Sequence, residues 1–202
     1  SAYVVEFAPL DDRELYTWLS SRFKRAGKSI SRDVADQLKF RAGTDLTRLD
    51  GEADKLIAHA GERGEILPED LDVVTPTLEC TIFQLIDDLV AHNGAGAYRR
   101  LAIMHDGGED DVRVLAMITR QMRFMAHIKL MQAKRVRDDE IIKALGINPY
   151  GLRNTRRQLG AFTEERLERA YRDCVDAEYA IKSGAMSDEE ALGRLMLNWL
   201  NS

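Results

Sequence analysis

The chain has 202 residues, of which 45% are hydrophobic and 31% charged, and it carries a formal net charge of −5. This length and apolar content suffice for one large domain or two small domains with buried cores, and they argue against a disordered chain. The acidic balance argues against a protein that binds nucleic acid over its whole surface, although it allows a local basic patch.

The two cysteines, Cys80 and Cys174, lie far apart and form no CxxC or Cys/His pattern of the kind that binds zinc. We therefore expect two reduced thiols and no metal site. No apolar run approaches the length of a membrane span, and no signal-peptide pattern opens the chain. These features predict a soluble, cytoplasmic protein without a membrane partner.

The first residues resemble the end of a preceding domain. Residues 3–7 have the composition of a short strand, but the rest of the chain predicts no sheet with which that strand could pair. We therefore expect residues 1–9 to be the remnant of an N-terminal domain that this chain lacks.

Residues 10–77 predict a small bundle of three helices followed by a short linker helix. Ser31 and either Thr44 or Asp45 are typical N-cap residues for the second and third helices. Glycines and prolines then interrupt the apolar pattern between residues 61 and 76, so we place a domain boundary near Thr77. The predicted helices cover residues 11–26, 31–43, 44–60 and 68–74.

Residues 78–202 predict a larger helical domain with almost no strand. The first of its helices ends near Asn93-Gly94 and the second near Gly107-Gly108. The third, from Asp110 to Lys134, has apolar residues on more than one face, so it should be buried on more than one side. The remaining helices cover residues 138–145, 149–159, 163–184 and a last segment that opens with a capping box at Ser187 and Glu190.

Residues 138–159 have the pattern of a helix-turn-helix, with its turn at Gly146-Ile147-Asn148. The second helix carries Arg153, Arg156 and Arg157, and arginine is a residue type that reaches phosphates and base edges in a major groove. The same pairing of helices is common in all-α domains, where a basic face is merely solvated. Two interpretations therefore stay open, a reader of nucleic acid and a structural pair of helices.

The long helix also carries a basic seam, which could bind an acidic partner. Acidic residues in the same domain make internal or inter-subunit ion pairs the simpler expectation. Apolar residues of the long helix and of the last helix are expected to supply both core and interface area. The basic seam consists of Arg120, Arg123, Lys129 and Lys134. The assembly candidates are Arg120, Arg123, Phe124, Lys129, Leu195 and Trp199.

No constellation of catalytic residues is visible. The four histidines are scattered, and adjacent carboxylates such as Asp87 and Asp88 diverge on a helix. The phosphate loop GxxxxGK[ST] is absent. We therefore expect no catalytic residue, no bound cofactor and no metal in this chain.

The order and spacing of several short motifs, taken together, are specific. These motifs are Leu15-x-x-Trp18, Gly43-Thr44-Asp45-Leu46 with Leu49 and Lys55-Leu56, Pro68-Glu69-Asp70-Leu71, Glu79-x-x-Ile82-Phe83-x-Leu85, Arg120-Gln121-Met122-Arg123, Lys129, Gly146-Ile147-Asn148-Pro149-Tyr150 and Ile181-Lys182-Ser183-Gly184. Through these motifs the chain, from about residue 7 to residue 200, resembles the C-terminal two-thirds of bacterial DNA polymerase III delta subunits, which are clamp-loader proteins.

The resemblance implies an AAA+-type architecture without its nucleotide-binding-like first domain. Residues 10–77 would be the small helical lid, and residues 78–202 the helical collar that joins clamp-loader subunits in a ring. The implied partners are clamp-loader subunits of the ATPase and delta-prime types. The absent domain would contact the sliding clamp, and DNA would be reached only through the complex.

The resemblance also bears on nucleotide chemistry. In ATP-hydrolysing relatives the lid helix presents an arginine just after its Gly-Thr or Gly-Ser turn, and here Leu46 takes that place. Arg48 lies about 200° further round the helix, away from such a role, and delta members of the family do not hydrolyse ATP. Two residues depart from the family pattern. Leu67 replaces a small capping residue, and Gly51 interrupts the third helix at a cost of about 1 kcal/mol.

We therefore expect an all-α, two-domain clamp-loader subunit that supplies a lid and an assembly collar during DNA replication. The chain itself has no predicted catalytic site, although the complex it would join belongs to a DNA-directed DNA polymerase. The alternative is a helix-turn-helix protein that binds nucleic acid through Arg153, Arg156 and Arg157.

Overall fold

The computed structural model describes residues 10–201, so the expected strand at residues 3–7 lies outside the described part of the chain. The chain divides into two compact units between Thr77 and Leu78. Within the described residues, ten α-helices and one 3₁₀ helix contrast with two strands of two residues each, which confirms the all-α class. None of these helices combines the length and the apolarity that crossing a lipid bilayer requires.

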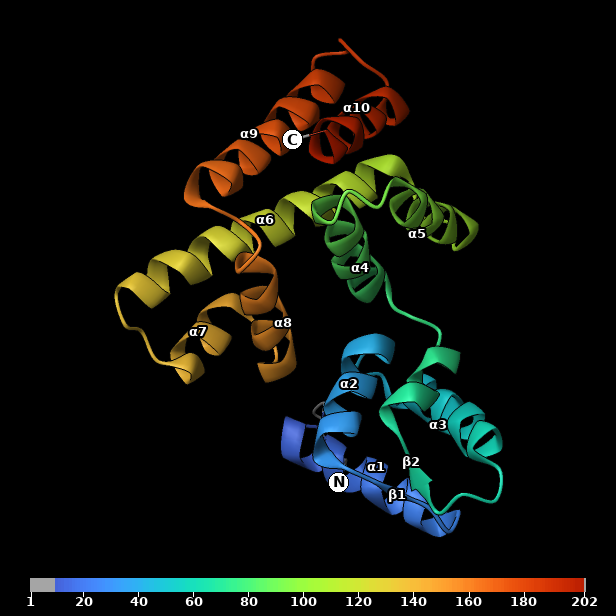
Figure 1. Cartoon of the computed structure of the whole chain (residues 1–202). Coiled ribbons are helices and arrows are strands. Elements are labelled where there is room, and N and C mark those ends of the chain that lie inside the picture. The colour runs from blue at the N-terminus through green and yellow to red at the C-terminus, as the bar shows by residue number, and fades with distance from the viewer. Residues whose placement is uncertain (1–9, 202) are drawn as a thin grey trace, which may run out of the picture. The chain divides into compact units, whose positions relative to one another are not determined.

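The first unit is a bundle of three helices closed by a 3₁₀ helix (Figure 1). The side chains of Asp11, Ser31 and Asp45 cap the three helices by accepting hydrogen bonds from backbone N–H groups in the first turns. The bundle buries leucines and one phenylalanine completely, with Leu19, Phe23, Leu38, Leu49 and Leu56 all 0% exposed. Its elements are α1 (Asp12–Arg25), α2 (Arg32–Ala42), α3 (Leu46–Ala60) and η1 (Pro68–Val73).

A short parallel ladder, which the sequence does not predict, joins two connections of this unit. The strand β1 (Ser29–Ile30) pairs with β2 (Glu65–Ile66), so that Ile30 lies beside Ile66. Both isoleucines are buried in the bundle core. Two residues per strand are too few to produce an alternating pattern that could be recognised in the sequence.

The loop before η1 is held by a buried carboxylate. Asp70 is 1% exposed, and its oxygens accept hydrogen bonds from the Arg63 guanidinium at 3.1 and 2.5 Å and from the Leu67 backbone N–H at 2.8 Å. The hydrogen bond from Arg63, followed by that from Leu67, holds the pKa of the Asp70 carboxyl below its usual range. By accepting from the Leu67 N–H, Asp70 makes the half of a capping box that requires no side-chain oxygen on Leu67, the N-cap residue of η1.

Gly51 lies inside α3, which continues through it without interruption. The glycine is exposed, and a Cβ placed on it would meet no atom within 4 Å. Its effect is therefore limited to the conformational freedom that glycine has in the unfolded chain.

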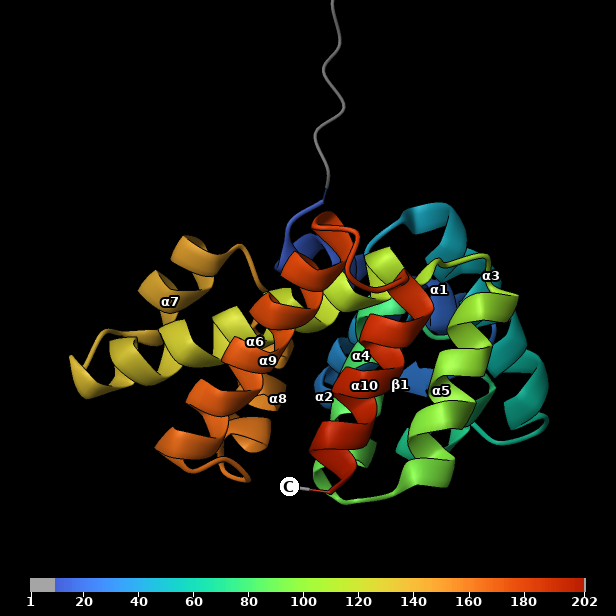
Figure 2. The same ribbon diagram turned by 90° about the horizontal axis from the view of Figure 1, so that it is seen from above.

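The second unit is arranged around α6 (Asp111–Ala133). The helices α4 (Leu78–Val90), α9 (Glu164–Lys182) and α10 (Asp188–Leu200) pack on one part of it, with α9 and α10 side by side (Figures 1 and 2). The short helices α7 (Asp138–Leu145) and α8 (Pro149–Leu159) pack near its C-terminal half. The helix α5 (Gly94–Asp106) packs mainly on α4.

Burial of α6 on more than one side is confirmed. One large core contains Val114, Leu115, Ile118, Met122 and Met125, and a separate small core contains Ile128 with Ile141 and Leu152. The predicted caps at Thr163 and Ser187 are also confirmed. One boundary is wrong: Asn93 does not end the helix before it, because α4 ends at Val90 and the Asn93 side chain instead caps α5.

Asp70→Asn should destabilise the first unit at pH 7 by about 1–3 kcal/mol, because the amide cannot replace both carboxylate hydrogen bonds to Arg63. Because folding lowers the pKa of the Asp70 carboxyl, its ionisation stabilises the folded state at pH values above the usual aspartate pKa. This stabilisation is lost as the pH falls through the lowered pKa. The difference in free energy of unfolding between wild type and variant, called the gap below, should therefore become smaller below about pH 4. Urea unfolding at several pH values measures it, with the exposed Asp72→Asn as control. An unchanged gap at pH 3 would contradict the assignment.

Gly51→Ala should stabilise the first unit by roughly 0.5–1 kcal/mol, because alanine loses less backbone entropy in the middle of an exposed helix. The control is Gly27→Ala, which should destabilise the unit because Gly27 has a φ of 72°, in the left-handed region. Thermal unfolding of the two variants tests both signs, and a lower melting temperature for Gly51→Ala would show that α3 needs the glycine.

Candidate functional site

The helix-turn-helix predicted in the second unit is present. Gly146 ends α7 with a φ of 62°, in the left-handed region that glycine adopts without strain. The Asn148 side chain then caps α8 by accepting a hydrogen bond from the Gly151 N–H at 2.6 Å. These local signals account for the turn, and Pro149 stands in the first turn of α8, where it is tolerated.

A buried chain of amides fixes α8 against α6 and α4. Gln121 and Gln158 are 4% and 3% exposed, and the Gln121 Nε2 donates to the Gln158 Oε1 at 2.9 Å. The Gln158 Nε2 in turn donates to the Phe83 carbonyl at 2.9 Å and to the Asp87 carboxylate at 2.8 Å. Because buried polar groups are costly without hydrogen-bond partners, this network fixes the position and orientation of α8 on α6 and α4.

The three candidate DNA-contacting arginines all have intramolecular contacts. Arg156 makes a bidentate ion pair with Asp138 at 2.8 and 2.6 Å, and this pair holds the pKa of the Asp138 carboxyl below its usual range. Arg157 pairs with Asp87 at 2.8 Å, and Arg153 lies over the Tyr150 ring at 4.8 Å. All three side chains are therefore engaged within the chain, and the geometry gives no support to a reader of nucleic acid.

Four of the assembly candidates lie on α6, and their surroundings differ. Arg120 lies over the Phe124 ring at 4.9 Å, and both side chains are half-buried. Lys129 approaches Glu164 at 3.8 Å, which is a loose pair. Arg123 is exposed and has no hydrogen bond or ion pair among the described residues.

The two assembly candidates on α10 are parts of the core. Leu195 and Trp199 are only 2% and 4% exposed and belong to the large apolar cluster. The Trp199 indole N–H donates to Asp173 at 3.2 Å, which ties α10 to α9. These two side chains therefore hold α9 and α10 together.

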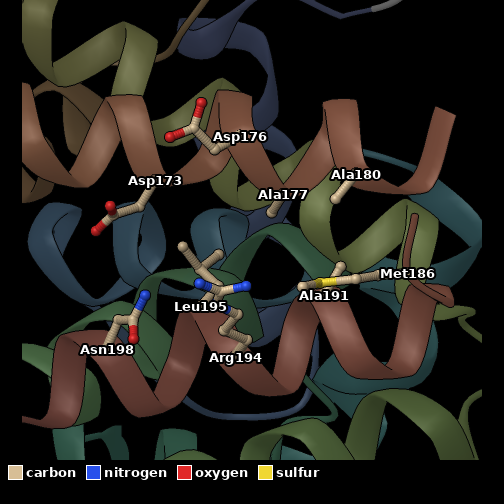
Figure 3. A pocket seen from close by; sticks show the side chains of 9 residues that line it. All are labelled: Asp173, Asp176, Ala177, Ala180, Met186, Ala191, Arg194, Leu195 and Asn198. Carbon is tan, nitrogen blue, oxygen red and sulfur yellow. The ribbon is translucent and has the colours of Figure 1, made fainter. Parts of the chain in front are cut away.

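A shallow pocket of about 210 Å³ lies between α9 and α10 (Figure 3). Asp173 and Asp176 line it from α9, and Arg194 and Asn198 from α10, over a floor that includes Ala177 and Leu195. Sequence reasoning missed this pocket because its walls come from two helices that show only ordinary amphipathic patterns. It holds no paired acid and base with a nucleophile, so it has no recognisable catalytic arrangement.

The histidine, cysteine and acidic side chains of the described residues do not gather into a metal site, and the cysteines lie in the interior. No group of three or more histidine, cysteine or acidic side chains could hold a metal ion in the described part of the chain. Both cysteines are buried, and burial raises the pKa of the Cys174 thiol to about 12. The thiol is therefore protonated at neutral pH and is not a nucleophile.

In the first unit, the position after the Gly43-Thr44 turn presents an apolar residue. Leu46 is 38% exposed and stands at the start of α3. The Arg48 guanidinium instead donates to the Thr75 and Pro76 carbonyls at 3.1 and 3.2 Å. Arg48 thus holds the segment after η1 and is directed away from the position of Leu46.

The fold defines a class of protein, an all-α chain whose described residues form two compact helical units. The family model described as "DNA polymerase III delta subunit, C-terminal domain" matches residues 79–199, which is more than half of the chain. This chain therefore belongs to the family of DNA polymerase III delta subunits.

Two further comparisons agree with that membership. DNA polymerase III subunit delta of Bacillus subtilis (strain 168) is 24% identical over 197 residues, which cover 97% of this chain and 56% of that protein. The solved structure of the Bacillus subtilis DNA clamp loader delta protein is similar in fold, with a TM-score of 0.73 and 22% identity, over 96% of this chain and 57% of that one. This chain spans a little over half the length of each relative.

Gln158→Ala should destabilise the second unit by roughly 1–3 kcal/mol, because it removes the buried hydrogen bonds that Gln158 makes with Gln121, with the Phe83 carbonyl and with Asp87. The matched control is Gln132→Ala, an exposed position on α6 where the change should stay within about 0.5 kcal/mol. Urea unfolding followed by circular dichroism measures both. Equal effects for the two variants would mean that the buried amide chain does not hold α8.

Proposed function

We propose that this protein is a clamp-loader subunit of the replicative DNA polymerase III, which does not hydrolyse ATP itself and helps to load the sliding clamp onto DNA. In this proposal residues 10–77 act as the helical lid and residues 78–202 as the collar through which subunits assemble. The observation that carries it is the family match over residues 79–199, which spans nearly the whole second unit.

The first unit supports a role without ATP hydrolysis. Where an arginine would face a nucleotide in ATP-hydrolysing relatives, the lid presents the apolar Leu46, and Arg48 is engaged by two backbone carbonyls. A side chain without charge or hydrogen-bond donors cannot stabilise phosphate oxygens. The lid would instead transmit the movements of neighbouring subunits that bind ATP.

The partners we propose are clamp-loader subunits of the ATPase and delta-prime types, in the cytoplasm. The sliding clamp would be bound by a domain outside this chain, and DNA would be reached through the complex. Within the collar, the candidates for contact with neighbouring subunits are Arg120, Arg123, Phe124 and Lys129, whose side chains reach the surface of α6 at least in part.

Co-expression with the ATPase and delta-prime-type subunits of the same organism tests the proposal. The full-length protein should elute with them as one complex on size exclusion, whereas a variant that ends at Thr77 should not, because it lacks the collar. The full-length protein alone should show no ATP hydrolysis. Failure of the full-length protein to join these subunits, or hydrolysis of ATP by it alone, would contradict the proposed function.

A further inference from the structure

The segment from Val112 to Arg137 has an unusual charge pattern for this chain. It contains seven lysines and arginines and no aspartate or glutamate, although the whole chain has 34 acidic and 29 basic residues. A solvated helix face usually mixes charges of both signs, because pairs three or four residues apart stabilise it. A segment of one sign within an acidic protein therefore requires a separate explanation.

Some cations of this segment pair with carboxylates outside it, and others do not. Arg113 pairs with Glu109 at 2.9 Å, Arg137 pairs with Asp139 at 3.0 Å, and Lys129 is loosely paired. Arg123, Lys134 and Arg135 have no ion pair or hydrogen bond from their side chains among the described residues. Internal pairing, the simpler expectation from the sequence, thus leaves these three charges unmatched.

Two of these three cations, Arg123 and Lys134, lie on one face of α6 and its C-cap. Arg123, His127, Leu130 and Lys134 follow each other at steps of four, three and four residues, which places them on one side of a helix over about 16 Å. All four are exposed, whereas Met122, Met125 and Ile128 on other faces are completely buried. We call these four residues the outer ridge of α6.

Leu130 stands between the cations of the outer ridge. Its side chain is 61% exposed, the highest value among the large aliphatic side chains of the described residues. Covering a leucine of this kind with apolar surface is favourable, because it removes apolar area from water. A phosphate backbone offers little such surface, whereas an amphipathic helix of a protein offers apolar and acidic side chains together.

We propose that the outer ridge of α6 binds an acidic helix of a neighbouring clamp-loader subunit. Leu130 enters an apolar site on that helix, and carboxylates at matching spacing pair with Arg123 and Lys134. The inference rests on the proposed function and adds to it the surface and the chemistry of the partner. Apolar contact at the centre with charges around it is the usual arrangement of protein interfaces.

The charge of the ridge is tested in the full-length protein with the double variant Arg123→Glu and Lys134→Glu. The control is the double variant Arg99→Glu and Lys143→Glu, which makes the same charge change at exposed cations off the ridge that have no partner among the described residues. Affinity for the ATPase and delta-prime-type subunits, measured by sedimentation, should fall at least about tenfold for the ridge variant and little for the control. Equal affinities for both variants would overturn the proposal.

The apolar contact is tested separately by Leu130→Ser, with Leu197→Ser as its match, since Leu197 is 51% exposed on α10. The first substitution should weaken assembly by about tenfold, and the second should leave it unchanged. Circular dichroism and thermal unfolding of each variant check that the fold is retained. Loss of assembly with Leu197→Ser but not with Leu130→Ser would move the interface away from the ridge.

Nucleic acid is the competing occupant, and the same variants distinguish it. If the ridge variants assembled normally but lost salt-dependent binding to a fluorescent oligonucleotide, the ridge would be a phosphate site and the proposal would be wrong. Normal assembly of the ridge variants would leave the proposed function intact. Failure of the wild-type protein to assemble would instead refute the proposed function, and the ridge proposal with it.

Discussion

The helix α6 has to bury apolar side chains in two separate cores at once, and the architecture of the second unit follows from this requirement. Met122 and Met125 lie in the large core, whereas Ile128, less than one turn further on, lies in a small core with Ile141 and Leu152. Because no single neighbour can cover both surfaces, the chain has to place helices against different parts of α6. The outer ridge is among the parts of α6 that these helices leave exposed.

The buried amides explain why a helix-turn-helix of DNA-reader appearance serves packing here. Gln158 is directed inward to Gln121 and Phe83, so α8 presents its polar side to the rest of its own unit. Arg156 forms an ion pair with Asp138, and Arg157 forms one with Asp87. Charge that is matched inside the chain adds little to binding, and the unmatched cations of α6 are the better candidates for a partner.

Local signals in the sequence were sufficient wherever a structure is decided within a few residues. The capping box at Ser187, the cap at Thr163 and the turn at Gly146 are of this kind, because the groups that satisfy each other are at most four residues apart. Asn93 shows the limit of such signals, since a helix end and a helix start favour the same residue. The β1–β2 ladder was missed because its strands are too short to form a pattern.

The sequence by itself determined the helical class, most helix boundaries, the width of the apolar surface of α6 and the family resemblance, because these depend on periodicity, caps and motif order. Only the tertiary structure decided which charges are matched. Arg157 and Asp87 are 70 residues apart, and no local rule pairs them. The same holds for Trp199, which looked like a candidate for an interface and lies in the core, since burial depends on what the rest of the chain places around a side chain.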